Sequence, residues 1–417
     1  MAEKTNVPEI RFAGFTDPWE QRKFSDMYVV NNERNANCEL GYDRTLSIAT
    51  MTFNGGNGAA DDSLSNYKVI RVGDIAFEGH TNKVHAYGRF VLNDAGDGLM
   101  SPRFSCLRPI VEQRYSFWKY YIPREESMRP ILVNATKSGT MMNELVPDDL
   151  MRESILVPCL AEQEVIGNSL SQLDHLITLH QRKYDKLAQL KKSMLDKMFP
   201  KPGERFPEIR FAGFTDPWEQ RKLGDCFEFL KNNTLSRADL NGENGTARNV
   251  HYGDILIKFG DCLDGERSDL PFITDDTVLP KYAGSILREG DVIFADTAED
   301  EAAGKCVELR KLPKEPTISG LHTIPARPRF PFGMGYLGHY LNSDAYHRQL
   351  LPLMQGIKVI SVSKAALQDT QVRFPGLSEQ TAIGAALSEI DALITLHQRK
   401  LELLRNTKKS LLDRMFI

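Results

Sequence analysis

The chain has 417 residues, of which 41% are hydrophobic and 26% are charged. This composition excludes a disordered chain, and the length is sufficient for two or more domains, each with its own core. The formal net charge of −4 argues against a chain that binds nucleic acid through a surface that is basic throughout.

The six cysteines are scattered along the chain without any C-x-x-C spacing. This pattern argues against a zinc site and against a disulfide framework, so we expect no bound metal. The apolar stretches are too short to span a membrane, and residues 1–8 lack the apolar core of a signal peptide. We therefore expect a cytoplasmic protein that does not associate with membranes.

The first element is a constant block, PEIRFAGFTDPWEQRK, which covers Pro8–Lys23 and returns without a change at Pro207–Lys222. Each copy contains Asp-Pro-Trp, which predicts a turn with a buried tryptophan as its anchor. The distance between the copies far exceeds the about 20–50 residues of solenoid or propeller repeats. The chain is therefore a duplicated module.

A variable insert follows the first block and mixes short β-like runs with turn signals. One run covers residues 67–77, in which Gly-Asp marks a turn, and a polar, aromatic and basic loop follows it at residues 79–89. Side chains of these types pair with base edges and phosphates, so this loop is a candidate DNA contact. The candidate residues are His80, Asn82, Lys83 and Arg89.

The segment Leu160–Phe199 predicts a long helix and returns as Leu377–Phe416 with 24 of 40 positions identical. Its apolar residues alternate at spacings of three and four, which is typical of a coiled-coil seam. At about 1.5 Å per residue, each helix would extend roughly 55 Å. The seam positions that we assign to helix pairing and partner docking are Ile166, Leu173, Ile177, His180, Leu187, Ile383, Ile390, Ile394, His397 and Leu404.

Polar residues interrupt this seam at matching places, His180 and His397 at one position and Lys191 and Lys408 at another. They either fix register and orientation, as single polar residues do in coiled coils, or lie at the edge of the seam and contact a partner subunit. A metal-binding role for the histidines is weaker, because no second ligand lies four residues further on. The sequence leaves the first two interpretations open.

The second insert repeats the β-like run and the Gly-Asp turn at Ser285–Phe294, but an acidic loop follows it. The candidate DNA contacts in this loop are Thr297 and Lys305. An offset of 217 already aligns Gly139 with Gly356 before the helices begin. The two inserts are therefore expected to share a fold although their sequences differ.

Neither insert is basic overall. Residues 27–159 contain 14 basic and 16 acidic residues, and residues 226–376 contain 17 basic and 20 acidic residues. Because phosphate neutralisation supplies much of the affinity for DNA, an insert that binds DNA must use a locally basic surface or partner subunits that supply positive charge.

These patterns predict an α+β protein with a pseudo-two-fold internal duplication. Two α+β domains, at residues 1–159 and 201–376, are joined by two long antiparallel coiled-coil helices at residues 160–200 and 377–417. The block that would complete the second copy is the one that precedes the first insert. This order predicts that both ends of the chain meet near the second helix.

Motifs that would indicate an enzyme are absent from the sequence. It contains no G-x-x-x-x-G-K-[ST] phosphate loop, no G-x-S-x-G nucleophile motif, no H-E-x-x-H zinc motif and no [DN]-P-P-[YF] tetrapeptide of amino-methyltransferases. Asp74, Glu78 and His80 are spaced similarly to a nuclease carboxylate pair, but its lysine is missing, so a chance arrangement is the stronger interpretation. We therefore expect no catalytic residues in this chain.

Four motifs that recur in order in both copies resemble those of the specificity subunits of type I restriction-modification enzymes. They are the PEIRF…WEQRK opening, the L-x-E-Q-x-x-I lead into each helix, the LITLHQRK run and the KKS-[ML]-L-D-[KR]-M-F ending. The resemblance covers essentially the full length of the chain.

This resemblance implies two target-recognition domains, each of which reads one half of a bipartite, asymmetric site in double-stranded DNA. The helices would set the length of the unread spacer and dock two modification subunits, which methylate adenine with S-adenosylmethionine. Restriction subunits that use ATP and Mg would complete the complex. This chain would bind no cofactor itself.

An alternative from another class is a duplicated coiled-coil scaffold that binds two protein partners and no DNA. Such a scaffold would show no sequence-selective DNA binding even with a methyltransferase subunit present.

Overall fold

The computed structural model describes residues 6–55, 61–139, 142–266 and 269–417. The chain divides into two compact units. Unit 1 comprises Met1–Gln181 and Lys400–Ile417, and unit 2 comprises Arg182–Arg399. Each unit therefore contains one insert together with a part of each long helix.

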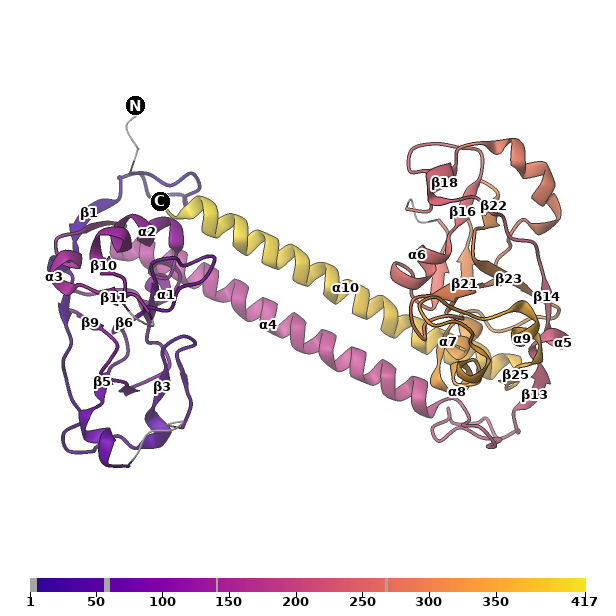
Figure 1. The fold of residues 1–417 in the computed structure, drawn as a ribbon, viewed down its shortest axis with the longest axis horizontal. Helices are drawn as coiled ribbons and strands as arrows, with labels where there is room; N and C mark the ends of the chain where they lie inside the picture. The colour runs from indigo at the N-terminus through magenta and orange to yellow at the C-terminus, as the bar shows by residue number, and fades with distance from the viewer. Residues whose placement is uncertain (1–5, 56–60, 140–141, 267–268) are drawn as a thin grey trace. The chain divides into compact units, whose positions relative to one another are not determined.

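The two long helices are α4 (Leu160–Lys197) and α10 (Leu377–Met415), the longest coiled ribbons in Figure 1. Neither contains a proline, and both are rich in strong helix formers. Every predicted seam residue on them is shielded from solvent to some degree. Ile166, Ile383 and Ile390 are buried, and Leu173, Ile177, His180, Leu187, Ile394, His397 and Leu404 are half-buried.

Within unit 1 the helices pair in opposite directions. Asp174 of α4 accepts a hydrogen bond from Lys408 of α10 at 2.6 Å, and Gln181, further along α4, accepts one from Arg405, earlier in α10. The same order holds within unit 2. The predicted antiparallel helix pair is therefore confirmed for each unit.

Unit 1 holds a four-stranded antiparallel sheet in the order β2-β9-β6-β7, with short satellite hairpins and three short helices. Its strands are β1 (Glu20–Lys23), β2 (Tyr28–Val30), β3 (Leu46–Ser47), β4 (Thr52–Phe53), β5 (Lys68–Ile70), β6 (Ile75–Glu78), β7 (Arg89–Leu92), β8 (Gly98–Met100), β9 (Cys106–Pro109), β10 (Thr136–Lys137), β11 (Glu144–Leu145) and β12 (Ser154–Val157). Its short helices are α1 (Tyr115–Tyr121), α2 (Glu125–Ala135) and α3 (Pro147–Leu150), with 3-10 turns at Phe24–Asp26, Tyr42–Arg44 and Asp61–Asn66.

Unit 2 holds a five-stranded sheet in the order β14-β23-β19-β21-β17 and a smaller four-stranded sheet. Its strands are β13 (Glu219–Lys222), β14 (Phe227–Phe229), β15 (Leu240–Asn241), β16 (Arg248–Val250), β17 (Cys262–Asp264), β18 (Phe272–Ile273), β19 (Val292–Ala295), β20 (Thr297–Ala298), β21 (Cys306–Lys311), β22 (Thr317–Ser319), β23 (Thr323–Pro328), β24 (Ile360–Ser361) and β25 (Gln371–Phe374). Its short helices are α5 (Leu223–Cys226), α6 (Tyr252–Ile257), α7 (Tyr336–Asn342), α8 (Asp344–His347) and α9 (Lys364–Asp369), with 3-10 turns at Arg237–Asp239, Asp276–Ser285 and Leu351–Leu353.

The two inserts share the topology of their main sheets. The order β2-β9-β6-β7 in unit 1 corresponds to β14-β23-β19-β21 in unit 2, and all these neighbours are antiparallel. Strand β17 adds a parallel fifth strand in unit 2. The expectation of one α+β fold for both inserts is confirmed, because the apolar pattern of the central strands is kept although the residues differ.

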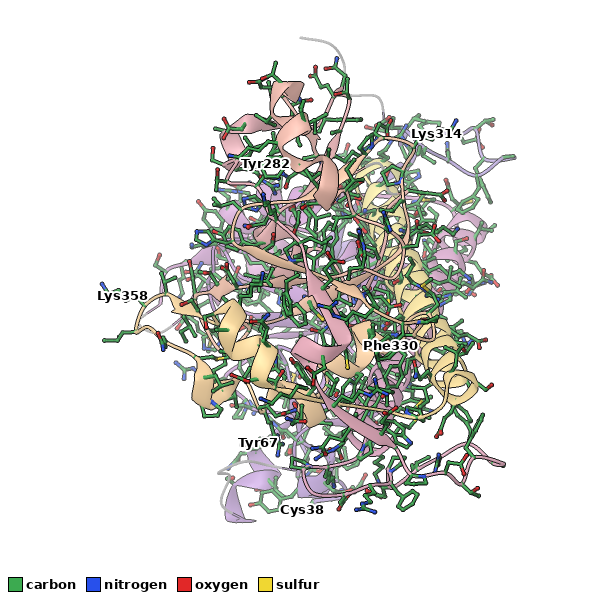
Figure 2. All side chains as sticks on the ribbon, turned by 90° about the vertical axis from the view of Figure 1, so that its right-hand side faces the viewer. Cys38, Tyr67, Tyr282, Lys314, Phe330 and Lys358 are labelled. Atoms are coloured by element: carbon green, nitrogen blue, oxygen red, sulfur yellow. The ribbon has the colours of Figure 1, made fainter. Side chains whose placement is uncertain are left out.

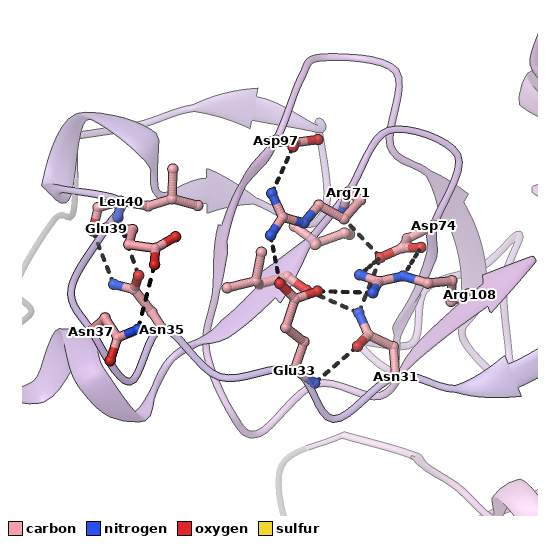
Figure 3. Close-up of polar contacts among 12 residues, drawn as sticks. Asn31, Glu33, Asn35, Asn37, Glu39, Leu40, Arg71, Asp74, Asp97 and Arg108 are labelled. Carbon is pink, nitrogen blue, oxygen red and sulfur yellow. Dashed lines mark hydrogen bonds and ion pairs between the residues drawn. The ribbon is translucent and has the colours of Figure 1, made fainter.

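The Gly-Asp turn that precedes each central strand needs its glycine. Gly73 and Gly290 have φ of +91° and +84°, a conformation that other residues rarely adopt. The aspartate that follows is buried in both units and forms a two-bonded ion pair with an arginine of the neighbouring strand. Asp74 binds Arg108 in this way, with N–O distances of 3.0 and 2.9 Å (Figure 3).

The Asp74 carboxylate also accepts hydrogen bonds from the Arg71 backbone N–H and from Asn31. Arg108 in turn contacts Glu33, and the hydrogen bond to Asp74 is the main cause that raises the pKa of Arg108. In unit 2, Asp291 and Arg327 repeat the ion pair at 3.0 and 2.7 Å. Both carboxylate oxygens of Asp74 therefore accept hydrogen bonds from within the fold. This supports the interpretation that its nuclease-like spacing arises by chance.

The two constant blocks close the units in the same way. Ile10 N–H donates to the Arg414 carbonyl at 2.9 Å in unit 1, and Ile209 N–H donates to the Lys197 carbonyl at 2.9 Å in unit 2. Trp19 is buried against Phe416, with ring centroids 6.4 Å apart. The predicted tryptophan anchor and the predicted meeting of the first block with the end of the second helix are both confirmed.

Candidate nucleic-acid interface

The recognition surfaces are carried by a frame, which we define as the two constant blocks and the two long helices. A buried ion pair joins the parts of this frame in each unit. Arg11 binds Glu162 with N–O distances of 2.6 and 2.7 Å, and Arg210 binds Glu379 with both distances at 2.6 Å. We call these two contacts the frame ion pairs. They explain why the opening arginine and the glutamate of L-x-E-Q-x-x-I occur in both copies.

The glutamine of the same motif fixes the insert to the helix. Gln163 accepts a hydrogen bond from the Arg114 backbone N–H and donates one to the Pro158 carbonyl. Gln380 makes the same two bonds with Gly333 and Pro375. Each long helix thus begins with one residue that holds the constant block and one that holds the insert.

A glycine one turn further along each helix lets the insert approach closely. A Cβ added to Gly167 would clash with Ser116 and the Phe117 backbone, and a Cβ added to Gly384 would clash with the backbone at Met334 and Tyr336. Both glycines lie four residues after the motif's glutamine. The insert therefore sits against the same small-residue step in both units, whatever its own sequence is.

The two seam lysines make ion pairs inside the chain. In unit 1, Lys408 binds Asp174, which also accepts a hydrogen bond from Tyr120 at 2.7 Å. In unit 2, Lys191 lies between Asp391 and Asp261, at 2.6 and 2.7 Å. Of the two interpretations of these lysines, the structure supports the one in which they fix the helix pairing.

The cluster around Lys191 in unit 2 is more polar than the cluster around Lys408 in unit 1, because His339 stands where unit 1 has Tyr120. His339 is fully buried, with its Nδ1 3.0 Å from Asp261 and its Nε2 3.8 Å from Asp391. Ligand atoms of Asp261, His339 and Asp391 all lie within 4.8 Å of one another, which is a spacing that could hold a metal ion. The Lys191 ammonium already occupies the position between the two carboxylates. The cluster therefore fits this lysine side chain in the place where a metal ion would bind.

We expect this cluster to make the stability of unit 2 depend on acid pH. Burial would raise the pKa of Asp261, but the hydrogen bond with His339 and the charge of Lys191 outweigh burial and lower it. A carboxylate with a lowered pKa stabilises the fold above its ordinary pKa of about 3.9, and this contribution is lost as the pH falls below that value. Between neutral pH and about pH 2, the free energy of unfolding of unit 2 should therefore fall by about 2 kcal/mol more in the wild type than in the Asp261→Asn variant.

The measurement is denaturant unfolding across that pH range, followed by Trp218 fluorescence in a background with Trp19→Phe and Trp118→Phe. Asp264→Asn is the matched control, since Asp264 lies three residues further on, at the end of β17, but is half exposed, 3.8 Å from Lys311. Equal acid dependence in the wild type and in Asp261→Asn would contradict the assignment.

The four candidate DNA contacts of unit 1 lie in and beside the loop after β6. His80 is exposed, with its Nδ1 2.5 Å from the buried Glu78 carboxylate. Asn82 accepts hydrogen bonds from two backbone N–H groups and so shapes the loop, while the Lys83 side chain is exposed. Arg89, on β7, is half-buried and donates to the Ala49 carbonyl. His80, Asn82 and Lys83 therefore face solvent, although the Asn82 side-chain oxygen is used by the loop itself.

The two candidates of unit 2 are separated in the structure. The Thr297 hydroxyl donates to Asp296 at 2.6 Å and lies 3.5 Å from His322. The Lys305 ammonium instead donates to the carbonyls of Leu256 and Phe259 at 3.1 Å, and burial lowers its pKa. Thr297 thus belongs to an exposed polar cluster, whereas the ammonium of Lys305 stabilises the end of α6.

The exposed cluster around Thr297 contains residues that the sequence did not single out. His322 lies in the turn between β22 and β23, close to Asp296, and Tyr252 from the start of α6 packs against its ring at 5.3 Å. The φ of +53° at His322 is the one signal that this position is special, and φ cannot be read from the sequence.

A second exposed feature of unit 2 is the loop between Gln355 and Ser361, whose backbones exchange two hydrogen bonds. Ile357 at its tip is 98% exposed and Val359 is 57% exposed. Figure 2 shows Lys358 projecting from the ribbon at this loop. An apolar tip beside a cation is suited to contact with a DNA groove.

Exposed leucines occupy equivalent positions on the outer faces of the long helices. Leu176 and Leu179 on α4 in unit 1 correspond to Leu393 and Leu396 on α10 in unit 2, and each is about 40% exposed. They come from the two copies of the LITLHQRK run.

In the described part of the chain, no helix is long and apolar enough to cross a membrane.

Residues 215–406 match the family described as the type I restriction modification DNA specificity domain. The type I restriction enzyme MjaVIII specificity subunit of Methanocaldococcus jannaschii is 24% identical over 269 residues, which is 62% of this chain and 60% of that relative. The putative type I restriction enzyme MjaX specificity subunit of the same organism is 22% identical in an alignment of 441 residues, gaps included, that covers 99% of this chain and 94% of that protein.

A solved structure shares the fold. The S subunit of a type I restriction-modification system from M. genitalium has a TM-score of 0.51 at 14% identity, and the alignment covers 99% of each chain. The HsdS subunit of Thermoanaerobacter tengcongensis has a TM-score of 0.45 at 18% identity, with 97% of this chain and 98% of that chain covered.

Two dissimilar α+β inserts, each held by the same frame of constant block and long helix, define a duplicated recognition protein. The domain matched over residues 215–406 and the two relatives point to a specificity subunit of a type I restriction-modification system.

Proposed function

We propose that the insert of each unit reads one half of a bipartite, asymmetric site in double-stranded DNA. The observation that carries this proposal is the repetition of the main frame contacts around two different surfaces. The frame ion pairs, the glutamine bonds and the close glycine step are the same in both units, so one set of supporting contacts holds two different surfaces. Different reading surfaces imply different half-sites, and hence an asymmetric target.

The long helices are proposed to dock two modification subunits and to set the length of the unread spacer. The paired exposed leucines of the LITLHQRK runs support this role, because two equivalent apolar patches suit two copies of one partner. The modification subunits would bind S-adenosylmethionine and methylate adenine. Restriction subunits would bind ATP and Mg, and the complex would work in the cytoplasm, where the DNA is.

Neither insert has an excess of basic residues, so the partner subunits are expected to supply much of the charge that neutralises phosphates. Lys83, in the loop after β6 of unit 1, and Lys358, in the loop between Gln355 and Ser361 of unit 2, are exposed cations that could contribute to DNA contact. This division of labour makes the chain alone a weak binder of DNA.

The test is to express the chain with a modification subunit encoded beside it and to map methylated adenines by single-molecule sequencing. We expect a bipartite, asymmetric motif with a fixed gap that disappears when the chain is deleted. Methylation that is unchanged without the chain would refute the proposal and favour a scaffold for protein partners.

A further inference from the structure

The central strands β6 and β19 end at the same place in the fold. Gly79, after β6, accepts a backbone hydrogen bond from Asn143, and Asp296, after β19, accepts one from Val362. The offset of 217 that relates the long helices also relates these two positions. In both units, a carboxylate and a histidine lie together at this end of the strand.

In unit 1 the pair is Glu78 and His80. The Glu78 Oε1 lies 2.5 Å from His80 Nδ1 and accepts the His80 backbone N–H at 3.0 Å. The Glu78 side chain is only 7% exposed, whereas that of His80 is 62% exposed. Both line a cavity of about 310 Å³ together with the polar residues Ser47, Asn54 and Ser101. The carboxylate thus fixes the ring at the edge of a polar hollow.

In unit 2 the pair is Asp296 and His322. The His322 Nδ1 lies 3.3 Å from Asp296 Oδ1, and the Thr297 hydroxyl donates to the same oxygen at 2.6 Å. The edge of the Tyr252 ring further restricts the imidazole, which is 48% exposed. The two histidines come from different loops, so the same pairing is reached by unrelated sequence.

The backbone at His322 is strained. A φ of +53° is uncommon outside glycine, although asparagine, aspartate and histidine adopt it more often than other residues, and strained residues concentrate where function requires them. Glycine would adopt this turn at lower cost. A histidine in this conformation is therefore a candidate for a functional side chain.

The geometry leaves the same atom available in both units. Nδ1 faces the carboxylate, and Nε2 has no partner among the described residues of either unit. Nε2 donates to guanine N7 or O6 when the ring is protonated, and it accepts from the cytosine or adenine amino group when the ring is neutral. The neighbouring carboxylate repels phosphate, so the pair is suited to a base edge rather than to the DNA backbone.

We propose that His80 and His322 are specificity-determining residues, each of which reads one base pair of its half-site through Nε2. Glu78 and Asp296 are positioning residues that orient the rings. This inference rests on the proposed function and names the chemistry of its reading surface.

The test compares variants in the assembled complex with modification subunits. His322→Asn suits the local backbone, because asparagine tolerates positive φ, and His322→Gly removes the side chain without strain. Both should reduce discrimination at one base pair of one half-site by about tenfold to a hundredfold and leave the other half-site unchanged. His80→Ala should do the same in the other half-site.

Two controls separate reading from folding. His347→Ala removes another histidine of unit 2, whose Nε2 bonds to the Glu301 carbonyl, and should leave the motif intact. Asp296→Ala should reproduce the effect of His322→Gly, and Asp296→Glu should restore most of the discrimination. A merely structural aspartate would not affect the same base pair as the histidine.

The readouts are the methylated motif and binding to duplexes substituted at each position. Unchanged discrimination in the His322 and His80 variants, or a loss of affinity that is equal for all sequences, would overturn the inference. If one of these two results is found while the wild type still methylates a bipartite motif, the inference fails but the proposed function stands. Absence of that motif in the wild type would instead refute the proposed function.

Discussion

A chain in which residues 24–153 replace residues 223–370 is expected to direct methylation to a symmetric site, an inverted repeat of one wild-type half-site. Both exchange points lie at equivalent backbone hydrogen bonds. Phe24 N–H donates to the Glu153 carbonyl at 3.0 Å, and Leu223 N–H donates to the Thr370 carbonyl at 2.8 Å. The chimera therefore keeps these bonds inside the transplanted insert.

The rest of the frame accepts either insert. Strand pairs β1–β12 and β13–β25 are antiparallel and lie outside the exchange points. Tyr120 of the transplanted insert would meet Asp391 and Lys191 in place of Asp174 and Lys408, so its polar partners keep their chemistry. Few contacts need to change for the insert to fold in its new position.

The measurement is single-molecule mapping of methylated adenines with wild-type modification subunits. The reciprocal chimera, with residues 223–370 in both places, is the matched control and should give an inverted repeat of the other half-site. An asymmetric motif from either assembled chimera would contradict the assignment of one half-site to each insert.

Glu162→Ala is expected to destabilise unit 1 by about 3–5 kcal/mol. The Glu162 side chain is fully buried, and Arg11 is only 12% exposed, so the change leaves a guanidinium in a dry environment without its partner. The hydrogen bond that Arg11 donates to Glu162 is the main cause that raises the pKa of Arg11. Because that arginine does not deprotonate, the loss cannot be relieved by neutralisation.

Unit 1 can be followed separately by the fluorescence of Trp19 and Trp118 in a Trp218→Phe background, since the chain has three tryptophans. Arg11→Met combined with Glu162→Leu should recover much of the stability, because a paired apolar replacement leaves no buried charge. Glu112→Ala, which breaks an exposed pair with Arg114, is the control and should cost at most about 1 kcal/mol. A small effect of Glu162→Ala would show that this frame ion pair is not needed for the fold.

The helices and the frame could be predicted from the sequence because their evidence is local or repeated. The seam follows from apolar spacing, and the buried Trp19 and Trp218 follow from two identical Asp-Pro-Trp turns. The residues of the frame ion pairs could be seen in the repeated motifs, but the sequence did not show which of them contact each other. Arg11 and Glu162 are 151 residues apart, and nothing in their spacing indicates contact.

The reading surface was less accessible to sequence. His80 was found because its loop directly follows a recognisable strand, whereas His322 reaches Thr297 from a turn 25 residues away. Lys305 looked like a free cation, yet its ammonium is held by two carbonyls. Such contacts depend on how loops from separate strands converge, and a dissimilar second insert offers no pattern to compare.

The contact between Trp19 and Phe416 also has a consequence for synthesis of the protein. Every residue of unit 2 precedes Phe416 in the chain, so unit 2 can complete its core while the aromatic cluster of Trp19 still lacks its last ring. Until then, apolar surface of unit 1 stays exposed on the ribosome, a condition that favours aggregation. Unit 1, although translated first, is finished last.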